Sequence, residues 1–308
     1  MRYLIVGAGA IGGYFGGRLL EAGCDVTFLL RQGRAEALQR TGLIVNSRFG
    51  DLALAPPPHL LSAGIDSTFD VVIVACKAYD LAETMASFAP AVGAATAILP
   101  LLNGMRHLDD LKSRFGPQRV LGGLCMISTT LDAAGTVHHL NDIHSLAFGE
   151  LDGTASARVT AILGDFSKAN FDGRSTSQIL QQMWEKWVFI ATVAGITCLM
   201  RASIGDIVAA GAGDLSLALL EECREIASAN GFELGAPGIE RARSIATATG
   251  SAFVASMLKD IERGAPVEAD HVVGDLLRRA SQDPQRPSLL RVAFAHLKAY
   301  QARRAHST

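Results

Sequence analysis

The sequence has little cysteine, and no two cysteines stand at metal-binding or redox spacing. Its five cysteines are scattered and odd in number, and none forms a C-x-x-C pair. This argues against a zinc knuckle or a disulfide framework and favours small buried residues in a reducing compartment. His138, His139 and His144 lie close together, but adjacent strand residues point to opposite faces and no carboxylate joins them at ligand spacing. We therefore predict no metal site.

Excess charge and long hydrophobic runs are also missing. The formal net charge is −2, so nothing draws the chain as a whole toward nucleic acid or an acidic membrane. The longest apolar run, residues 187–200, has 14 residues and contains Gly195, which is too short for a membrane-spanning helix. The apolar stretch behind Arg2 is rich in glycine and no cleavage site follows it, unlike a secretory signal. We expect a cytoplasmic protein without a nucleic-acid or membrane partner.

The first half of the chain has the pattern of an α/β domain. Continuous apolar runs predict buried strands at residues 3–6, 25–30, 70–75 and 96–99, and helical patterns fall at residues 11–22, 33–40 and 79–88. Such alternation is typical of βαβ units around a parallel sheet. Further strands are expected at residues 43–45 and 52–54, as a hairpin insert, and at residues 120–130, 135–139 and 145–149, as antiparallel strands.

The second half reads as helices alone. Strand-like runs disappear from residue 177 onward, and helices are expected at residues 178–200, 214–230, 239–249, 252–263, 269–281 and 288–304. A chain of 308 residues is long enough for two domains, at about 100–200 residues each. The predicted fold is an α/β N-terminal Rossmann-type dinucleotide-binding domain, residues 1–175, followed by an all-α C-terminal domain, residues 176–308.

A glycine motif joins the first strand to the first helix. It has the form G-x-G-x-x-G and comprises Gly7, Ala8, Gly9, Ala10, Ile11 and Gly12. In this context Gly7 allows the tight turn, Gly9 lets the backbone approach a pyrophosphate, and Gly12 lets helix and strand pack closely. The phosphates then sit at the helix N-terminus. The motif predicts a bound dinucleotide.

The residue after the second strand indicates which dinucleotide is bound. That strand ends at Leu30 and is followed by Arg31, with Arg34 close behind. In an NAD-binding fold a carboxylate at this point accepts the ribose 2′-hydroxyl. A guanidinium instead pairs with a 2′-phosphate, which a carboxylate would repel. We predict NADP (NADPH) as the cofactor; the alternative is a solvated surface arginine.

Two polar residues follow later strands of the same sheet. Lys77 comes just after the strand at residues 70–75, and Asn103 follows the strand at residues 96–99. Ligands of such sheets bind at the carboxyl ends of the strands, so both residues are candidates for the site. The alternatives are a surface lysine and a turn asparagine in front of Gly104.

These features resemble the ketopantoate reductase (2-dehydropantoate 2-reductase) family over the whole chain. Besides the glycine loop and Arg31, the resemblance rests on C-K-A-Y at residues 76–79 and L-N-G-M at residues 102–105. W-E-K-W at residues 184–187 is similar to the family's L-W-x-K, and S-M-L-K-D at residues 256–260 with V-E-A-D at residues 267–270 is similar to S-M-x-x-D…T-E-I-D. The resemblance implies NADPH-dependent reduction of 2-dehydropantoate to pantoate, in pantothenate biosynthesis.

The resemblance also implies roles for individual residues. Lys186 matches the catalytic lysine, Glu268 a glutamate near the active site, and Ser256 a contact to the substrate carboxylate, while Asn103 and Lys77 match residues that line the nicotinamide and substrate cleft. An ammonium suits this chemistry, because hydride attack on a ketone builds negative charge on oxygen that needs stabilisation and then a proton. The alternatives are a lysine that snorkels from a buried helix, a helix N-terminal glutamate and an N-cap or surface serine.

One departure from the family bears on the substrate. Four and eight residues after the lysine, where the family usually carries asparagine, this chain has Ile190 and Ala194, on the same helical face as Lys186. The reductase chemistry is untouched, but the polar wall has become apolar. Three readings stay open: a ketopantoate reductase, a related NADP-dependent dehydrogenase of a more apolar 2-oxo acid or hydroxy acid, and a non-catalytic NADP sensor. The expected partner is a small 2-oxo acid, with a homodimer as one alternative for the assembly.

Overall fold

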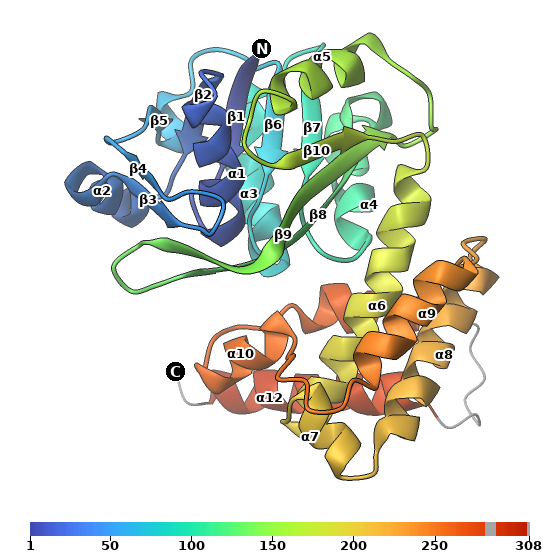
Figure 1. The fold of residues 1–308 in the computed structure, drawn as a ribbon. Coiled ribbons are helices and arrows are strands. Elements are labelled where there is room, and N and C mark those ends of the chain that lie inside the picture. The colour runs from blue at the N-terminus through green and yellow to red at the C-terminus, as the bar shows by residue number, and fades with distance from the viewer. Residues whose placement is uncertain (281–287, 307–308) are drawn as a thin grey trace. The chain divides into compact units, whose positions relative to one another are not determined.

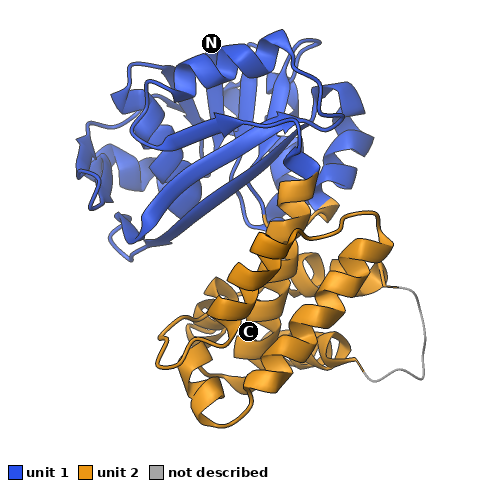
Figure 2. Ribbon diagram, turned by 45° about the vertical axis from the view of Figure 1, so that its right-hand side comes forward, with its two compact units in different colours: residues 1–102, 107–180 blue, residues 103–106, 181–308 orange. Residues whose placement is uncertain are grey.

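The computed structural model describes residues 1–280 and 288–306 of the chain (Figure 1). These residues form two compact units, which Figure 2 shows in separate colours. The first unit contains residues 1–102 and 107–180. The second contains the chain from residue 181 onward and, in addition, the short segment of residues 103–106. The loop that carries Asn103 therefore packs with the helices and not with the sheet that precedes it.

A five-stranded parallel sheet forms the centre of the first unit; four of its strands lie where the sequence predicted them, and the short strand at residues 59–60 was not predicted. Its order is β5-β2-β1-β6-β7. The strands are β1 (Arg2–Val6), β2 (Asp25–Leu29), β5 (His59–Leu60), β6 (Val71–Val74) and β7 (Ala97–Pro100). All residues of β6 and β7 are buried, which explains their uninterrupted apolar sequences. The helices of this unit are α1 (Ala10–Glu21), α2 (Gln32–Thr41), α3 (Leu81–Phe88), α4 (Arg106–Phe115) and α5 (Ala157–Phe166), of which the sequence analysis missed the last two.

A second, mixed sheet completes the first unit. It contains β10 (Asp172–Ser175), β9 (Val137–Glu150), β3 (Leu43–Asn46) and β4 (Leu52–Leu54) in this order, with β8 (Leu121–Leu131) paired to β9. The predicted hairpin insert, β3 and β4, is antiparallel as expected and joins β9 through β3. The separate strands predicted at residues 135–139 and 145–149 were wrong, because β9 runs through both without a break. The register with β8 shifts in the polar stretch between them, and there the Asn141 side-chain Oδ1 accepts a hydrogen bond from the Ser128 N–H at 2.9 Å.

Helix α1 lies between the two sheets because glycine lines two of its faces. A Cβ on Gly16 would lie 2.7 Å from the Phe28 ring of the parallel sheet. A Cβ on Gly17 would lie 2.8 Å from Leu52, and one on Gly13 3.1 Å from Val137, both in the second sheet. The glycine-rich start of the chain is therefore a packing device as well as a turn.

Replacing Gly12 with alanine is expected to lower the free energy of unfolding by about 1–3 kcal/mol, the usual cost of overpacking. The added Cβ would lie 2.0 Å from the Gly7 carbonyl oxygen, which is a backbone atom. Gly33→Ala in α2 is the matched control, since nothing lies within 4 Å of its Cβ position. The control should stabilise the chain by about 0.4–1 kcal/mol. Urea unfolding followed by circular dichroism measures both, and equal effects would refute the close packing at Gly12.

The described part of the second unit is built from helices, which confirms the predicted fold class. The helices are α6 (Ile179–Met200, whose first two residues lie in the first unit), α7 (Ile204–Ala209), α8 (Gly213–Ala229), α9 (Ala236–Ala246), α10 (Ser256–Glu262), the π-helical segment η5 (Asp270–Gly274), α11 (Asp275–Arg278) and α12 (Leu289–Ala305). Among the described residues, α6 is the one helix long and apolar enough to cross a membrane by length and composition. Since 67% of its apolar window is buried inside the protein, α6 is a core helix.

Nothing in the sequence indicated α7, α9 was expected three residues too late, at residues 239–249, and two further predicted helices differ more. The helix predicted at residues 252–263 begins only at Ser256, because the preceding backbone binds the start of α7: the Gly205 N–H donates to the Ser251 carbonyl at 2.8 Å and the Ile204 N–H to the Phe253 carbonyl at 3.0 Å. The helix predicted at residues 269–281 is a π-helical segment that continues into α11, and its last predicted residue, Ser281, lies outside the described residues.

Candidate active site

The glycine loop in the first unit has the geometry that a pyrophosphate needs. Gly7 has φ of +93°, which favours glycine, and its N–H donates to the Leu29 carbonyl at 3.0 Å. Gly9 caps the N-terminus of α1, and nothing lies within 4 Å of the position where its side chain would start. The first turn of α1 has no acidic residue, so its positive pole can face an anion. These features fit the phosphates of a dinucleotide.

Arg34 stabilises the glycine loop through two hydrogen bonds. Its Nε donates to the Ala8 carbonyl at 2.9 Å, and its Nη2 donates to the Gly135 carbonyl at 3.1 Å in the turn before β9. Burial lowers the pKa of this guanidinium below its usual value. Arg34 was expected near the ribose together with Arg31. In the structure, its two hydrogen bonds connect the glycine loop to the turn before β9 of the second sheet.

Arg31 and Lys77 follow strands on opposite sides of β1. Arg31 comes after β2, at the N-cap of α2, and its side chain is 63% exposed. Lys77 comes after β6, at the start of the turn Ala78–Asp80, and is half-buried. Both therefore flank the glycine loop at the carboxyl edge of the parallel sheet, as predicted from their places in the sequence.

In the second unit, the Asn103–Gly104 turn packs against two helical segments. Gly104 has φ of +81°, and a Cβ there would lie 2.6 Å from the His271 carbonyl oxygen of η5 and 3.7 Å from Trp187 Nε1 of α6. Asn103 itself is half-buried. Only glycine allows the backbone of this turn to approach η5 so closely.

Lys186 and Glu268 lie on the same two segments. Lys186 is half-buried on α6, next to Trp187, whose Nε1 donates to the Val272 carbonyl of η5 at 2.8 Å. Glu268 directly precedes the helical turn of η5, is 9% exposed, and its backbone carbonyl accepts from the Val272 N–H at 3.0 Å. The segments that carry Asn103, Lys186 and Glu268 therefore meet in the second unit, at the contact between α6 and η5.

Ser256, the first residue of α10, lies near the end of α6 and not beside Lys186. It is exposed at the first position of α10, and the preceding Ala255 donates its N–H to Thr197 Oγ1 at 3.4 Å. Thr197 is 11 residues beyond Lys186, which is about 16 Å along a helix axis. The contact through Ala255 therefore places Ser256 near the end of α6, far along that helix from Lys186. Nothing in the sequence indicated that Lys186 and Ser256 are separated in this way.

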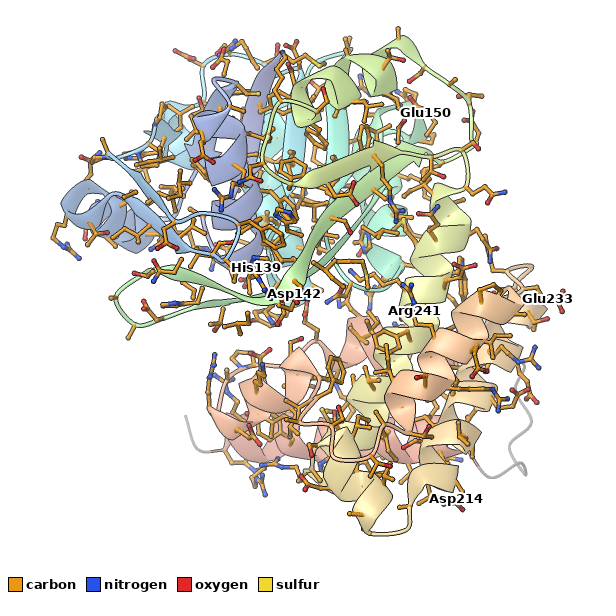
Figure 3. The ribbon with its side chains drawn as sticks, viewed as in Figure 1. His139, Asp142, Glu150, Asp214, Glu233 and Arg241 are labelled. Atoms are coloured by element: carbon orange, nitrogen blue, oxygen red, sulfur yellow. The ribbon has the colours of Figure 1, made fainter. Side chains whose placement is uncertain are left out.

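The three clustered histidines each have a structural partner in the first unit. Figure 3 labels His139 on β9. His144 lies 2.8 Å from the Tyr14 hydroxyl and stacks on Phe49 with ring centroids 3.8 Å apart. His138 lies 2.8 Å from Asp132, and His139 lies 2.9 Å from the Ser47 hydroxyl. No group of three or more potential metal ligands occurs within residues 1–280 and 288–306.

None of the five cysteines, all of which the structure describes, forms a disulfide. Cys125, Cys198 and Cys223 are buried, and Cys24 and Cys76 are half-buried. Burial raises the pKa of the Cys198 and Cys223 thiols to about 12. At neutral pH these two thiols are therefore protonated and unreactive.

Comparison with protein families covers nearly the whole chain. The family model described as "Ketopantoate reductase PanE/ApbA" matches residues 3–153, and the model described as "Ketopantoate reductase PanE/ApbA C terminal" matches residues 178–301. The two models divide the sequence between an N-terminal and a C-terminal match, in the order of the α/β and helical parts of the fold.

Individual relatives agree with this result. The "Uncharacterized oxidoreductase YkpB" of Bacillus subtilis is 38% identical over 303 residues, which is 98% of this chain and 99% of the relative. The structure of 2-dehydropantoate 2-reductase from Methylococcus capsulatus superposes with a TM-score of 0.86 at 26% identity and covers 99% of this chain and 98% of its own. The structure of D-mandelate dehydrogenase with NADH and anilino(oxo)acetate has a TM-score of 0.87 at 20% identity, with 99% of each chain covered, and is similar in fold.

Proposed function

Since the chain belongs to the ketopantoate reductase PanE/ApbA family, we propose that it uses NADPH to reduce a 2-oxo acid to a 2-hydroxy acid. Members of this family are oxidoreductases that use a nicotinamide dinucleotide and bind small 2-oxo acids. Residues 1–175 would hold the cofactor and residues 176–308 the substrate. Five cysteines without a disulfide, and a long apolar helix that is buried inside the protein, fit our proposal of a cytoplasmic enzyme.

Lys186 is the proposed proton donor. A bound NADPH supplies the hydride that attacks the keto carbon. The Lys186 ammonium stabilises the negative charge that develops on the keto oxygen, and it then donates a proton from Nζ to that oxygen. Its half-buried place on α6 suits this role, because a partly desolvated ammonium interacts more strongly with a developing charge than a fully hydrated one.

The neighbouring polar groups orient the reactants. The buried Glu268 carboxylate is proposed to position either the lysine or a substrate hydroxyl, and the Asn103 amide to bind the keto oxygen or the nicotinamide. The resemblance matches Ser256 to a contact with the substrate carboxylate, but its place near the end of α6 speaks against this role when Lys186 acts on the keto oxygen of the same small acid. Lys77, at the edge of the parallel sheet, is proposed to line the cofactor site together with the glycine loop and Arg31.

One observation carries the proposal: the Asn103–Gly104 turn, α6 and η5 meet in one compact unit. The turn lies so close to η5 that a Cβ added to Gly104 would be 2.6 Å from the His271 carbonyl oxygen, and the 2.8 Å hydrogen bond from Trp187 to Val272 joins α6 to η5. A non-catalytic NADP sensor would have no need to keep a lysine, a carboxylate and an amide on segments locked in this way. NADPH oxidation in the presence of 2-oxo acids tests the proposal directly.

The wall of the site next to Lys186 favours an apolar substrate. Ile190 is half-buried, one helical turn from Lys186, whereas Ala194 is only 4% exposed and is covered by protein. Two threonines of α6 do not restore a hydroxyl contact, because Thr192 is 1% exposed and Thr197 is fully buried; their hydroxyls donate to the Val188 and Val193 carbonyls at 2.8 and 2.6 Å. A substrate hydroxyl that meets Ile190 finds no partner there, at a cost of roughly 1–3 kcal/mol.

Ketopantoate is therefore expected to be a poor substrate, with kcat/KM at least ~10-fold below that of a preferred, unhydroxylated 2-oxo acid. The variant Ile190→Asn should raise kcat/KM for ketopantoate relative to straight-chain 2-oxo acids, because an amide at this position can bind the hydroxyl. Steady-state assays with the two substrates measure this ratio. Ile190→Val, which stays apolar, is the control and should leave the ratio within about twofold.

A wild-type enzyme that prefers ketopantoate to every other 2-oxo acid would overturn this argument. The presence of Ile190 and Ala194 in place of the family's usual asparagines would then not affect substrate preference. The chain would be a ketopantoate reductase in pantothenate biosynthesis.

A further inference from the structure

Arg31 does not stand alone at the edge of the parallel sheet. Its Nη2 lies 3.0 Å from Glu83 Oε2, and its Nη1 lies 3.5 Å from Asp80 Oδ2. The side chains of Arg31 and Glu83 are 63% and 75% exposed, and that of Asp80 is 33% exposed. An arginine selected only for a 2′-phosphate would not need two carboxylates beside it.

The sheet topology brings these three side chains together over the glycine loop. Arg31 follows β2, whereas Asp80 and Glu83 follow β6 at the start of α3, and β1 lies between these strands. The contact therefore reaches across the carboxyl end of β1, where the Gly7–Gly12 turn begins. Asp80 occupies the N-cap position of α3 but makes no side-chain capping bond. Its carboxylate is directed to Arg31 and is not used to cap the helix.

The two ribose substituents place opposite demands on such a cluster. A 2′-phosphate carries about −1.5 to −2 charges near neutral pH. Bound to Arg31, it would lie next to two carboxylates, which repel it. A 2′-hydroxyl instead donates a hydrogen bond to a carboxylate, as in NAD-binding folds. Exposed ion pairs are weak, so Arg31 can leave the carboxylates. Arg31 can then bind a 2′-phosphate, or a carboxylate can bind a 2′-hydroxyl.

We propose that Asp80 and Glu83 set the cofactor preference by offsetting Arg31, so that the ribose subsite accepts both NADPH and NADH with a narrowed preference for NADPH. The proposal rests on the proposed function, since it concerns the dinucleotide of that reaction. Arg31 supplies the attraction for a 2′-phosphate. Asp80 and Glu83 weaken that attraction and supply an acceptor for a 2′-hydroxyl.

The test compares two nucleotides that differ only in the 2′-phosphate. Adenosine 2′,5′-bisphosphate and 5′-AMP are titrated into the full-length protein by calorimetry, with wild type, Asp80→Asn, Glu83→Gln and the double variant. A 2′-phosphate and a carboxylate about 6 Å apart repel each other even in screened water. Removing one carboxylate should therefore raise the affinity for the bisphosphate about threefold to tenfold. The affinity for 5′-AMP should stay the same or fall. NADPH and NADH binding, followed by nicotinamide fluorescence, should shift in the same directions.

Glu36→Gln is the matched control. Glu36 is an exposed carboxylate on α2 that accepts from Gln32 at 2.7 Å, so its removal changes the net charge equally without touching Arg31. It should change bisphosphate affinity by less than about twofold, because Glu36 pairs with Gln32 and not with Arg31, and an exposed charge is screened. Each substitution replaces a carboxylate by its amide at a partly or fully exposed position. Glu83 is more exposed than Asp80, so Glu83→Gln still tests the proposal if Asp80→Asn perturbs α3.

Two results would overturn the proposal. Bisphosphate affinity that is unchanged or lower in Glu83→Gln would mean that the carboxylates are idle or merely position Arg31. A gain of equal size for 5′-AMP would mean a general charge effect. The proposed function is judged separately by turnover: wild type that binds these nucleotides but reduces no 2-oxo acid would contradict the reductase and leave the role of the carboxylates supported by their binding data.

Discussion

Replacing Lys186 with alanine is expected to lower kcat by at least ~10², because general acid catalysis is typically worth 10²–10⁴ in rate. The ammonium of Lys186 is the proposed source of both the charge stabilisation and the proton at the keto oxygen. NADPH binding should persist, since the glycine loop, Arg31 and Arg34 all belong to the first unit of the chain. Stopped-flow or steady-state NADPH oxidation measures kcat, and nicotinamide fluorescence measures binding.

Lys168→Ala is the control for this experiment. Lys168 is a surface lysine that pairs with Asp165 at 2.8 Å and has a side chain 60% exposed. Its loss should leave kcat within about twofold, because exposed ion pairs contribute little. Near-normal turnover in Lys186→Ala would remove this lysine from the mechanism.

Replacing Arg31 with alanine should raise the KM for NADPH about 10- to 150-fold, which corresponds to the ~1.5–3 kcal/mol of a hydrogen bond to a charged group. The KM for NADH should change much less, because NADH has no 2′-phosphate. Since the side chain is 63% exposed and paired with Asp80 and Glu83, we expect an effect near the lower end of that range. Initial rates with each cofactor at saturating 2-oxo acid provide both constants.

Arg48→Ala offers a close match as a control. Arg48 is 61% exposed and forms an ion pair with Asp142, but it lies in the turn between β3 and β4, away from the carboxyl edge of the parallel sheet. It should leave both constants unchanged. Equal losses for NADPH and NADH in Arg31→Ala would show that the guanidinium does not sense the 2′-phosphate.

The parallel sheet was predictable because its strands are buried on both faces. A run such as Val71–Val74 has no polar residue, and the glycine motif between β1 and α1 has a spacing that few other structures require. The same local signals predicted the helices of the second half, whose periodic patterns are long. The positions of Arg31 and Lys77 followed from these strands.

Features that depend on distant contacts escaped the sequence. The continuity of β9 through Asn141 depends on Ser128 of β8, and the late start of α10 depends on the binding of residues 251–253 to α7. Arg34 looked like a second ribose residue because only the folded chain brings Ala8 and Gly135 to it. The carboxylates of Asp80 and Glu83 come from another βα unit, so nothing near Arg31 in the sequence announced them.

Only part of the candidate site could be predicted, because its geometry also depends on contacts between residues far apart in the sequence. Lys186, Glu268 and Asn103 were named from short motifs, but the sequence offered no means of learning that Gly104 packs on η5 or that Trp187 binds Val272. The difference between Ile190, which is half-buried, and Ala194, which is covered, also required the structure. Spacing on an ideal helix treats the two positions as equal.

The most direct test of the central claim is NADPH oxidation by the purified wild-type chain against a panel of 2-oxo acids that includes ketopantoate and straight-chain, branched and aromatic acids without a hydroxyl. The account predicts turnover with NADPH, the highest kcat/KM for one of the apolar acids, and a value at least ~10-fold lower for ketopantoate. If no 2-oxo acid in the panel supports NADPH oxidation above the rate without substrate, the chain is not the reductase proposed here.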